Sequence, residues 1–520
     1  MIKIFSYAVN IVLLAILSQS FAQTEKVRRF SKDWKKQGPE KSWNSTEHEY
    51  FYKWRNSLLE KRLAKNNQLL RRQKAILNGN KITTEIWNYG SISSPGNRVT
   101  DIVWEGLGYG YEFGPFIGAI VPVPANSHQD AFPKLDGSGN PVLDDDGNPI
   151  WLARVISDGL VSLGGEISPD GKTFYGWEPL AFNESGVPYG DPNSPRIPTS
   201  NDVDRTGDGK PDSWPEGWYN PNLKRYVWPG ALRQGSSNSD LESFFVVDDR
   251  SNKEFKYYPF PNDSTRMGLG IEIECRYYQW SNPLAEDVIF LIYKVTNKSE
   301  KDLEDVIFGM WGDPHIGGPS NWQDDLSYFD RDLNMVYAWD EDNRSDVAGR
   351  KPGYFGYIFL ESPGNPYDQI DNDGDGIVDE SRNNGIDDDG DWDPSKHDVG
   401  VDGLPNTGDF GENDGTPTAG DAFDIRQPGE PNFEWTDLDE SDMIGLTSFA
   451  APNFGGNNRI SKDDYIYTSF MNPGQFDSLN SDVAGDNIFL YGSGRFTLKA
   501  GEARRFSIAL LVGDSYDDLT

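Results

Sequence analysis

Residues 271–297 read Ile-Glu-Ile-Glu-Cys-Arg-Tyr-Tyr-Gln-Trp-Ser-Asn-Pro-Leu-Ala-Glu-Asp-Val-Ile-Phe-Leu-Ile-Tyr-Lys-Val-Thr-Asn. Apolar and charged side chains alternate in the first eight residues, which is the period of a strand with one buried face. We expect strands over Glu272–Trp280 and Val288–Thr296. Cys275 points to the same side as Ile271 and Ile273, so its thiol is predicted to be buried and inert. This stretch therefore indicates neighbouring antiparallel strands.

The same composition, rich in Ile, Val, Phe, Tyr and Trp between Gly, Pro, Asn and Asp clusters, recurs along the chain. It predicts strands at Val306–Trp311, Met335–Trp339, Tyr354–Leu360, Tyr465–Phe470, Ile488–Tyr491, Arg495–Leu498 and Ala503–Val512. Residues 271–311 are expected to form a meander that turns at Asn297–Asp302, and Gly492–Gly494 is expected to be a hairpin turn. No long helical period interrupts these strands. The fold class is therefore predicted to be mainly β, with one or two antiparallel β-sandwiches.

The first 22 residues have the features of a signal peptide. Lys3 supplies the positive charge, Ile11–Leu17 the apolar run, and Ser20-Phe21-Ala22 a small-x-small cleavage site before Gln23. The apolar run is too short to span a bilayer as an anchor. We expect an exported mature chain with no transmembrane span, either secreted or at the outer cell surface.

Residues 23–80 form a separate basic segment. Residues 23–81 carry 16 basic and 6 acidic side chains. Apolar residues at helical spacing follow a capping-box sequence at Thr46–Glu49, and Asn78-Gly79 is expected to end the helix. This helix either docks its apolar stripe on the main domain, or binds an anionic partner. That partner is either an anionic cell surface, to which the helix would attach a surface scaffold, or the acidic insert of the same chain.

Charge and cysteine content restrict the remaining organisation. The formal net charge is −35 and Cys275 is the only cysteine. Nucleic acid is therefore not expected as a partner, and no internal disulfide framework exists. We predict a β-sandwich region at 81–360, an acidic insert at 361–440 and the remaining strands at 441–520, and we expect the natural chain to continue beyond Thr520. An ordered insert of that length requires an organiser, for which calcium is suited.

A calcium-binding loop is predicted at residues 371–380, Asp-Asn-Asp-Gly-Asp-Gly-Ile-Val-Asp-Glu. Asp371, Asp373 and Asp375 alternate before Gly376, as in the signature D-x-[DN]-x-[DN]-G. Calcium requires six to eight oxygen ligands, so Ile377 would contribute its carbonyl and Asp379 a carboxylate. The twelfth position is Arg382 rather than Glu, which excludes an EF-hand. The alternative is that Asp, Asn and Gly only form turns here.

Two weaker copies of this pattern are predicted to bind calcium as well. The ligand positions are Asp204, Thr206, Asp208, Lys210 (through its carbonyl) and Asp212 in the first copy, and Asp387, Asp389 and Asp391 in the second. The second copy has Trp392 where the glycine belongs, which makes the turn harder to form. Asp144–Asp146, before Gly147, is predicted to be a hairpin turn only.

Two resemblances follow from these residues. The Asp-rich loops resemble those of thrombospondin type 3 repeats, in which successive loops share calcium ions. A second set of short motifs resembles a family of large exported surface proteins of Gram-negative bacteria, many of them secreted by the type IX route. The motifs are Asn88–Gly90, Trp104–Gly106, Tyr109–Val121, Tyr293–Asn297, Phe308–Asp313, Gly429–Asn432 and Asp437–Thr447. This resemblance implies an extracellular or surface location and no established reaction.

The sequence contains no recognisable catalytic motif. The four histidines, His48, His128, His315 and His397, show no metal-ligand spacing. Asp313-Pro-His315, close to Asp324 and Asp325, is interpreted as a strand-end turn, with a small site as the alternative. We predict a non-catalytic, calcium-binding structural or adhesive protein with cell-surface polysaccharide or other surface proteins as partners.

One alternative is a module that binds or degrades polysaccharide. A glycosidase needs only two carboxylates at the right separation, and exposed aromatics can stack on sugars. The candidate aromatics lie in loop-like contexts, at Trp87, Trp151, Trp177, Trp214, Trp218 and Trp228.

Overall fold

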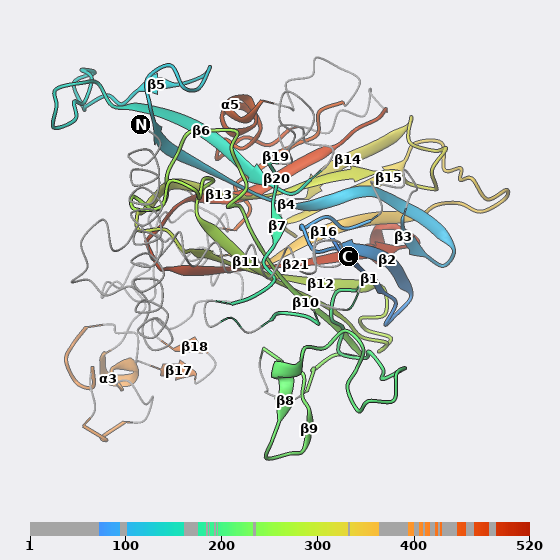
Figure 1. Cartoon of the computed structure of the whole chain (residues 1–520). Helices are drawn as coiled ribbons and strands as arrows, with labels where there is room; N and C mark the ends of the chain where they lie inside the picture. Colours follow the sequence, from blue (N-terminus) through green and yellow to red (C-terminus); the bar gives the residue numbers. More distant parts are fainter. Residues whose placement is uncertain are drawn as a thin grey trace, which may run out of the picture.

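The computed structural model describes residues 72–93, 101–160, 175–183, 186, 188–191, 194, 196–231, 236–330, 333–362, 394–399, 405–408, 411–416, 422–424, 427–428, 445–453, 462–477 and 485–520. Within these residues the chain is mainly β, and its two large antiparallel sheets pack as layers (Figure 1). The predicted fold class is confirmed. The predicted signal peptide, residues 23–71 and the predicted loops at 371–379 and 387–391 lie outside the described residues.

The first sheet is built around one long strand, β4 (Leu107–Val123). The order is β1-β2-β3-β4-β13-β20-β19, and β6 also pairs with β4 and β5 with β6. Its other strands are β1 (Lys74–Leu77), β2 (Ile82–Trp87), β3 (Asp101–Trp104), β5 (Phe132–Pro133), β6 (Trp151–Asp158), β13 (Leu303–Pro314), β19 (Ser448–Ala450) and β20 (Phe489–Leu498). Because β4 is long, β3 and β6 pair with successive parts of one of its edges. β13 pairs with the opposite edge of β4.

The second sheet has the order β14-β15-β16-β21-β12-β11-β10-β7. Its strands are β7 (Glu178–Pro179), β10 (Leu241–Asp248), β11 (Ile271–Gln279), β12 (Val288–Asn297), β14 (Asp325–Asp330), β15 (Met335–Asp340), β16 (Tyr354–Glu361) and β21 (Ala503–Gly513). Two short hairpins complete the described strands, β8 (Tyr219–Asn220) with β9 (Arg225–Tyr226) and β17 (Ala422–Asp424) with β18 (Gln427–Pro428).

Aromatic rings fill the space between the sheets. Phe308 of β13 stacks on Phe506 of β21 with ring centroids 4.0 Å apart, so this contact joins the two layers. Phe113 of β4 packs against Phe355 and Tyr357 of β16, at 4.9 and 5.5 Å. Cys275 is fully buried in the same core, as predicted, and burial raises the pKa of its thiol.

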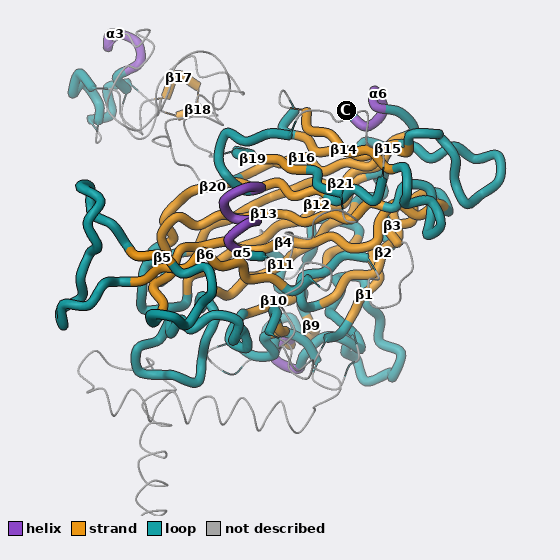
Figure 2. Tube along the Cα trace, turned by 90° about the horizontal axis from the view of Figure 1, so that it is seen from above, coloured by secondary structure: helices purple, strands orange, loops and turns teal. Residues whose placement is uncertain are grey.

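Short helices lie outside the core. α5 (Asp463–Tyr465) and the π-helical turn η3 (Ile466–Phe470) lie against the first sheet, where Tyr467 packs with Trp311 (Figure 2). The prediction of a strand at Tyr465–Phe470 is therefore wrong. α6 (Tyr516–Leu519) packs on β16 and β21, and α3 spans Pro394–His397. Among the described residues, no helix has the length and apolar content to cross a bilayer.

Three further predictions are corrected. β12 and β13 belong to different sheets, so residues 298–302 connect the layers and the meander ends at β12. Residues 492–494 lie inside the single strand β20 rather than in a turn. At the end of the predicted basic helix, Lys74–Leu77 forms strand β1, whose Leu77 enters the core, and the following Asn78-Gly79 leads into β2.

The turn predicted at Asp144–Asp146 is present, with Gly147 at φ +81°.

Candidate functional site

The loop Asp204–Asp212 is the predicted calcium loop that lies within the described residues. Gly207 and Gly209 have positive φ, at +77° and +88°, which gives the tight turn expected from the sequence. The Asp204 carboxylate accepts hydrogen bonds from the backbone N–H groups of Gly209 (2.7 Å), Gly207 (2.6 Å) and Asp208 (3.2 Å). These bonds lower the pKa of Asp204, with the Gly209 bond as the largest cause. The loop is thus ordered around its first predicted ligand.

The other end of this loop is surrounded by cationic side chains. Asp212 accepts a hydrogen bond from the backbone N–H of Arg205 at 2.9 Å, and it pairs with the side chains of Arg205 at 2.9 Å and Arg196 at 3.4 Å. The backbone hydrogen bond is the largest cause of its lowered pKa, and the two guanidinium groups act in the same direction. Lys210 pairs with Asp191. A calcium ion at this loop would compete with these cations for Asp212, so binding at Asp204, Thr206, Asp208, Lys210 and Asp212 stays a prediction.

A group of carboxylates gathers where β14 begins and β15 ends. Asp325 and Asp340 are cross-strand partners, and Asp324 and Asp342 flank them in the chain. One carboxylate oxygen from each of Asp324, Asp340 and Asp342 lies within 4.8 Å of the others. We call Asp324, Asp325, Asp340 and Asp342 the strand-end acidic group. Burial raises the pKa of Asp340 to about 6, and the nearby charges of Asp324 and Asp342 act in the same direction.

Asp325 is the most enclosed member of the strand-end acidic group, with no exposed surface. Its Oδ2 accepts a hydrogen bond from the backbone N–H of Ile316 at 3.1 Å. Its Oδ1 is buried and has no hydrogen-bond donor among the described residues. Burial, together with the charges of Asp340, Asp324 and Asp313, raises the pKa of Asp325 well above its ordinary value. A buried carboxylate oxygen without a donor is costly unless a cation is near.

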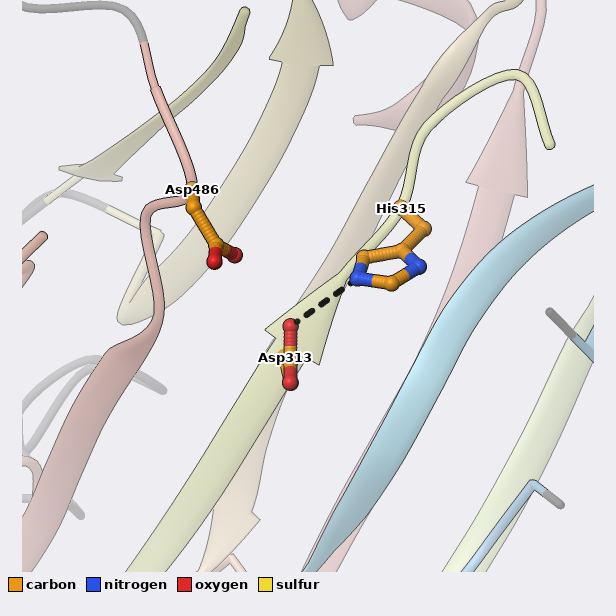
Figure 3. A group of neighbouring side chains, drawn as sticks. All are labelled: Asp313, His315 and Asp486. Atoms are coloured by element: carbon orange, nitrogen blue, oxygen red, sulfur yellow. Dashed lines mark ion pairs between the residues drawn. The ribbon is translucent and has the colours of Figure 1, made fainter. Parts of the chain in front are cut away.

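A second group lies at the end of β13, where Asp313, His315 and Asp486 point toward one another (Figure 3). We call these three residues the histidine group. His315 Nε2 lies 3.4 Å from Asp313 Oδ1, and one ligand atom of each residue lies within 4.8 Å of the others. Asp313 is buried, and its Oδ1 makes no hydrogen bond among the described residues. Burial raises the pKa of Asp486 to about 6, Asp313 adds to this rise, and His315 opposes it.

The backbone holds the histidine group in place. His315 donates its N–H to the carbonyl of Tyr109 at 3.1 Å, and its ring stacks on Tyr111 at 5.1 Å. Asp486 is fixed by its neighbours, because Gly485 N–H and the Asn487 side chain both donate to the Asp325 carbonyl, at 3.3 and 2.8 Å. The two groups are therefore linked through Asp325.

A separate cavity of about 630 Å³ lies on β10, β11, β12 and β21. Tyr278 and Trp280 line it with stacked rings, 5.9 Å apart and inclined by 17°, and Phe290 meets Trp280 edge-on. Arg276 and Arg505 also line it. In contrast, three of the tryptophans considered from the sequence as sugar contacts are buried, namely Trp177, Trp214 and Trp228.

Comparison with known proteins assigns neither a family nor a function to this chain, because no family model and no curated protein matches it. The site is therefore defined by its residues alone. The sequence singled out Asp313, His315, Asp324 and Asp325 without joining them to Asp340, Asp342 or Asp486. The sequence did contain one signal for the strand-end acidic group. Asp324-Asp325 stands at the start of one strand of a hairpin and Asp340-Glu-Asp342 at the end of the other, so these acids meet at the same end of the hairpin.

Proposed function

We propose that this protein is a non-catalytic, calcium-binding structural protein of the extracellular space or cell surface. The observation that carries the proposal is the strand-end acidic group, in which carboxylate oxygens of Asp324, Asp340 and Asp342 converge and the cross-strand neighbour of Asp340, Asp325, has a buried Oδ1 without a donor among the described residues. Its ligand atoms are all oxygens, the ligand type that hard cations such as calcium require. Carboxylates at this spacing repel one another, and a divalent cation would remove that repulsion.

The proposed role of the ion is to hold two loops together. Residues 317–324 enter β14 and residues 341–350 follow β15, and Asn321 already bridges them by donating to Asp340 at 2.7 Å and to the Arg344 carbonyl at 2.7 Å. An ion bound to carboxylates of both loops would make the same connection more strongly. The Asp-rich loop predicted at residues 371–379 would bind calcium in the same way. The net charge of −35 favours such cations throughout the chain.

The proposed location rests on the predicted signal peptide and on the affinity expected of such sites. Calcium sites of extracellular modules have dissociation constants of about 10⁻⁴–10⁻³ M, so the calcium concentrations outside a cell would occupy sites of this affinity. The resemblance to exported bacterial surface proteins points the same way. Attachment to polysaccharide or to other surface proteins is part of the proposal.

Calcium is expected to raise the free energy of unfolding. At 10 mM calcium, sites with the affinities given above would each add about 1–3 kcal/mol. Calorimetric titration of the chelator-treated protein, together with melting curves with and without calcium, measures both quantities. Asp340→Asn is expected to remove one binding event, and Asp373→Ala to remove another.

A matched control is Asp145→Asn, in the turn that is predicted not to bind calcium. It is expected to retain the stoichiometry and the calcium-dependent rise in melting temperature. Absence of saturable binding at 10 mM calcium, or unchanged stoichiometry in Asp340→Asn, would contradict binding at the strand-end acidic group.

The cavity on the second sheet supports polysaccharide binding as the second candidate function. The nearly parallel rings of Tyr278 and Trp280 offer flat apolar surfaces. Arg276 and Arg505 also line the cavity, but Arg276 already pairs with Glu242 and Glu274, and Arg505 with Glu361, so a ligand would have to share these donors. A cavity of about 630 Å³ is within the size range of small-ligand sites.

Trp280→Ala is expected to weaken oligosaccharide binding by about 5- to 150-fold if this cavity is used, because it removes a stacking surface worth about 1–3 kcal/mol by analogy with base stacking. A glycan array followed by calorimetry on the best ligand measures the change. Tyr219→Ala, which removes an exposed aromatic from the β8–β9 hairpin, serves as the control. Equal binding by both variants would exclude the cavity.

A further inference from the structure

We propose that Asp313, His315 and Asp486 form a binding site for a divalent transition-metal ion of the zinc class. This site is separate from calcium binding at the strand-end acidic group. It rests on three features of the histidine group: the distance between its ligand atoms, a buried carboxylate oxygen without a donor, and the chemistry of the imidazole.

The distance between Asp313 Oδ1 and His315 Nε2 is 3.4 Å. A direct hydrogen bond between these atoms would be shorter, at about 2.7–2.9 Å for a charged pair. Zinc binds nitrogen and oxygen at about 2.0–2.2 Å, so two ligands of a tetrahedral ion lie about 3.4 Å apart. The spacing of these two atoms therefore matches two ligands around one ion. Asp486 supplies a third ligand atom within 4.8 Å of the other two, so the group offers three protein ligands.

The unsatisfied oxygen is the second feature. Asp313 is 94% buried at a relative exposed surface of 6%, and its Oδ1 has no hydrogen-bond donor among the described residues. Figure 3 shows this oxygen directed toward His315, in the space that Asp486 also faces. Loss of hydration at such an oxygen is unfavourable, and a bound cation would offset that cost.

The third feature is ligand chemistry. Imidazole nitrogen suits zinc, copper, iron and nickel, whereas calcium and magnesium favour oxygen ligands. One imidazole with two carboxylates resembles the three-ligand sets that leave a further position for water. Asp486 is only partly buried, so an ion could enter from its side. The backbone contacts at Tyr109 and Asp325 hold the ligands in position, which reduces the ordering needed on binding.

Equilibrium dialysis of the chelator-treated full chain against zinc, with 2 mM calcium present throughout, tests this site. Wild type is expected to bind one zinc equivalent that calcium does not displace. His315→Ala and Asp486→Asn are each expected to weaken this binding by more than about 100-fold, since changes to groups that merely orient metal ligands already cost about 10–100-fold. Cobalt gives an independent readout, because its visible absorption is intense in a tetrahedral site and should be lost in both variants.

Asp342→Asn is the matched control, because it removes a carboxylate from the neighbouring strand-end acidic group and is expected to retain the zinc equivalent. Melting curves in chelator establish whether each variant folds. If His315→Ala does not fold, Asp486→Asn provides the test, because Asp486 is only partly buried. Zinc binding that survives in both His315→Ala and Asp486→Asn would overturn the proposal. So would full displacement of zinc by 2 mM calcium, or the absence of zinc binding in wild type, in which case Asp313 and His315 form only an ion pair.

Discussion

Replacement of Asp249 by alanine is expected to lower the free energy of unfolding by about 3–5 kcal/mol. Asp249 is fully buried directly after β10, and its carboxylate accepts four hydrogen bonds. Three come from the backbone N–H groups of Leu269, Gly270 and Ile271, at 2.5, 3.1 and 3.1 Å, and the fourth from the Ser157 hydroxyl at 3.2 Å. Since Ser157 lies in the first sheet and Ile271 in the second, alanine would leave buried donors without an acceptor in both layers. Denaturant unfolding followed by fluorescence measures the loss.

Two variants separate the causes of this loss. Asp249→Asn keeps the side-chain volume but has one acceptor oxygen, so we expect an intermediate cost of about 1–3 kcal/mol. Asp240→Ala removes a carboxylate that also accepts two hydrogen bonds, from Ser281, but at an exposed position. Its replacement is expected to cost much less than that of Asp249, because solvent screens an exposed carboxylate. A loss below 1 kcal/mol in Asp249→Ala itself would show that this network does not stabilise the fold.

Asp249 is also expected to make the free energy of unfolding depend on pH. Burial raises the pKa of Asp249 from 3.8 to about 7, although its backbone donors oppose the rise, and the charge of Asp248 adds to it. Between pH 4 and 7 the folded state therefore holds a proton that the unfolded state has released, so this contribution to stability falls as pH rises. We expect this part of the slope to be absent in Asp249→Asn. Parallel slopes in wild type and variant would contradict the assignment.

Replacement of Phe113 by alanine is expected to cost about 3–5 kcal/mol, the range for a buried Phe replaced by Ala. Phe113 belongs to β4 in the first sheet, and its ring packs on Phe355 and Tyr357 of the second sheet and on Phe489 of β20. The deletion would leave a cavity lined by rigid aromatic rings, which cannot move in to fill it. Denaturant unfolding at constant pH measures the effect.

Leu284→Ala is the control for this experiment, because Leu284 is 93% exposed and its replacement is expected to change stability by less than about 0.5 kcal/mol. Phe113→Leu retains an apolar side chain and is expected to lie between the two. If Phe113→Ala and Leu284→Ala have equal effects, the contact between the layers at Phe113 does not stabilise the sandwich.

The strand-forming composition predicted the strands well, both where buried and partly buried residues alternate, as at the start of β11, and where both faces are buried, as in the second half of β21. β11, β12, β15, β16 and β21 begin and end within one or two residues of the predicted bounds. The sheet partners were not predictable in the same way. β12 pairs with β21, whose residues lie more than 200 positions later, and local composition carries no information about such pairing.

The errors have identifiable physical causes. Gly492 and Gly494 were interpreted as a turn, yet a Cβ at Gly492 would lie 2.1 Å from the Met471 side chain and 2.8 Å from the Phe308 carbonyl. These glycines therefore permit close approach within a strand. Tyr465–Phe470 has strand-forming residues, but Tyr467 is placed by packing with Trp311 and Arg495 on the sheet surface, and this tertiary contact overrides local propensity.

The candidate site was predicted only in part for a related reason. The sequence placed Asp313 and His315 at the end of a strand, which the structure confirms. Asp486 is 171 residues away from His315 and has no motif around it, and it reaches the group through the hydrogen bonds of Gly485 and Asn487 to Asp325. A site assembled from distant loops of a β-sandwich leaves no spacing signature in the chain.

The position of β21 in the second sheet has a consequence for how the chain is made. β21 lies between β16 and β12, so that the strands on either side of it are all synthesised earlier. Until residues 503–513 leave the ribosome, the sheet exists only as two separate parts, each with an open edge able to pair with other chains. The second sheet can therefore be completed only after residues 503–513 have been synthesised and have paired with both β12 and β16.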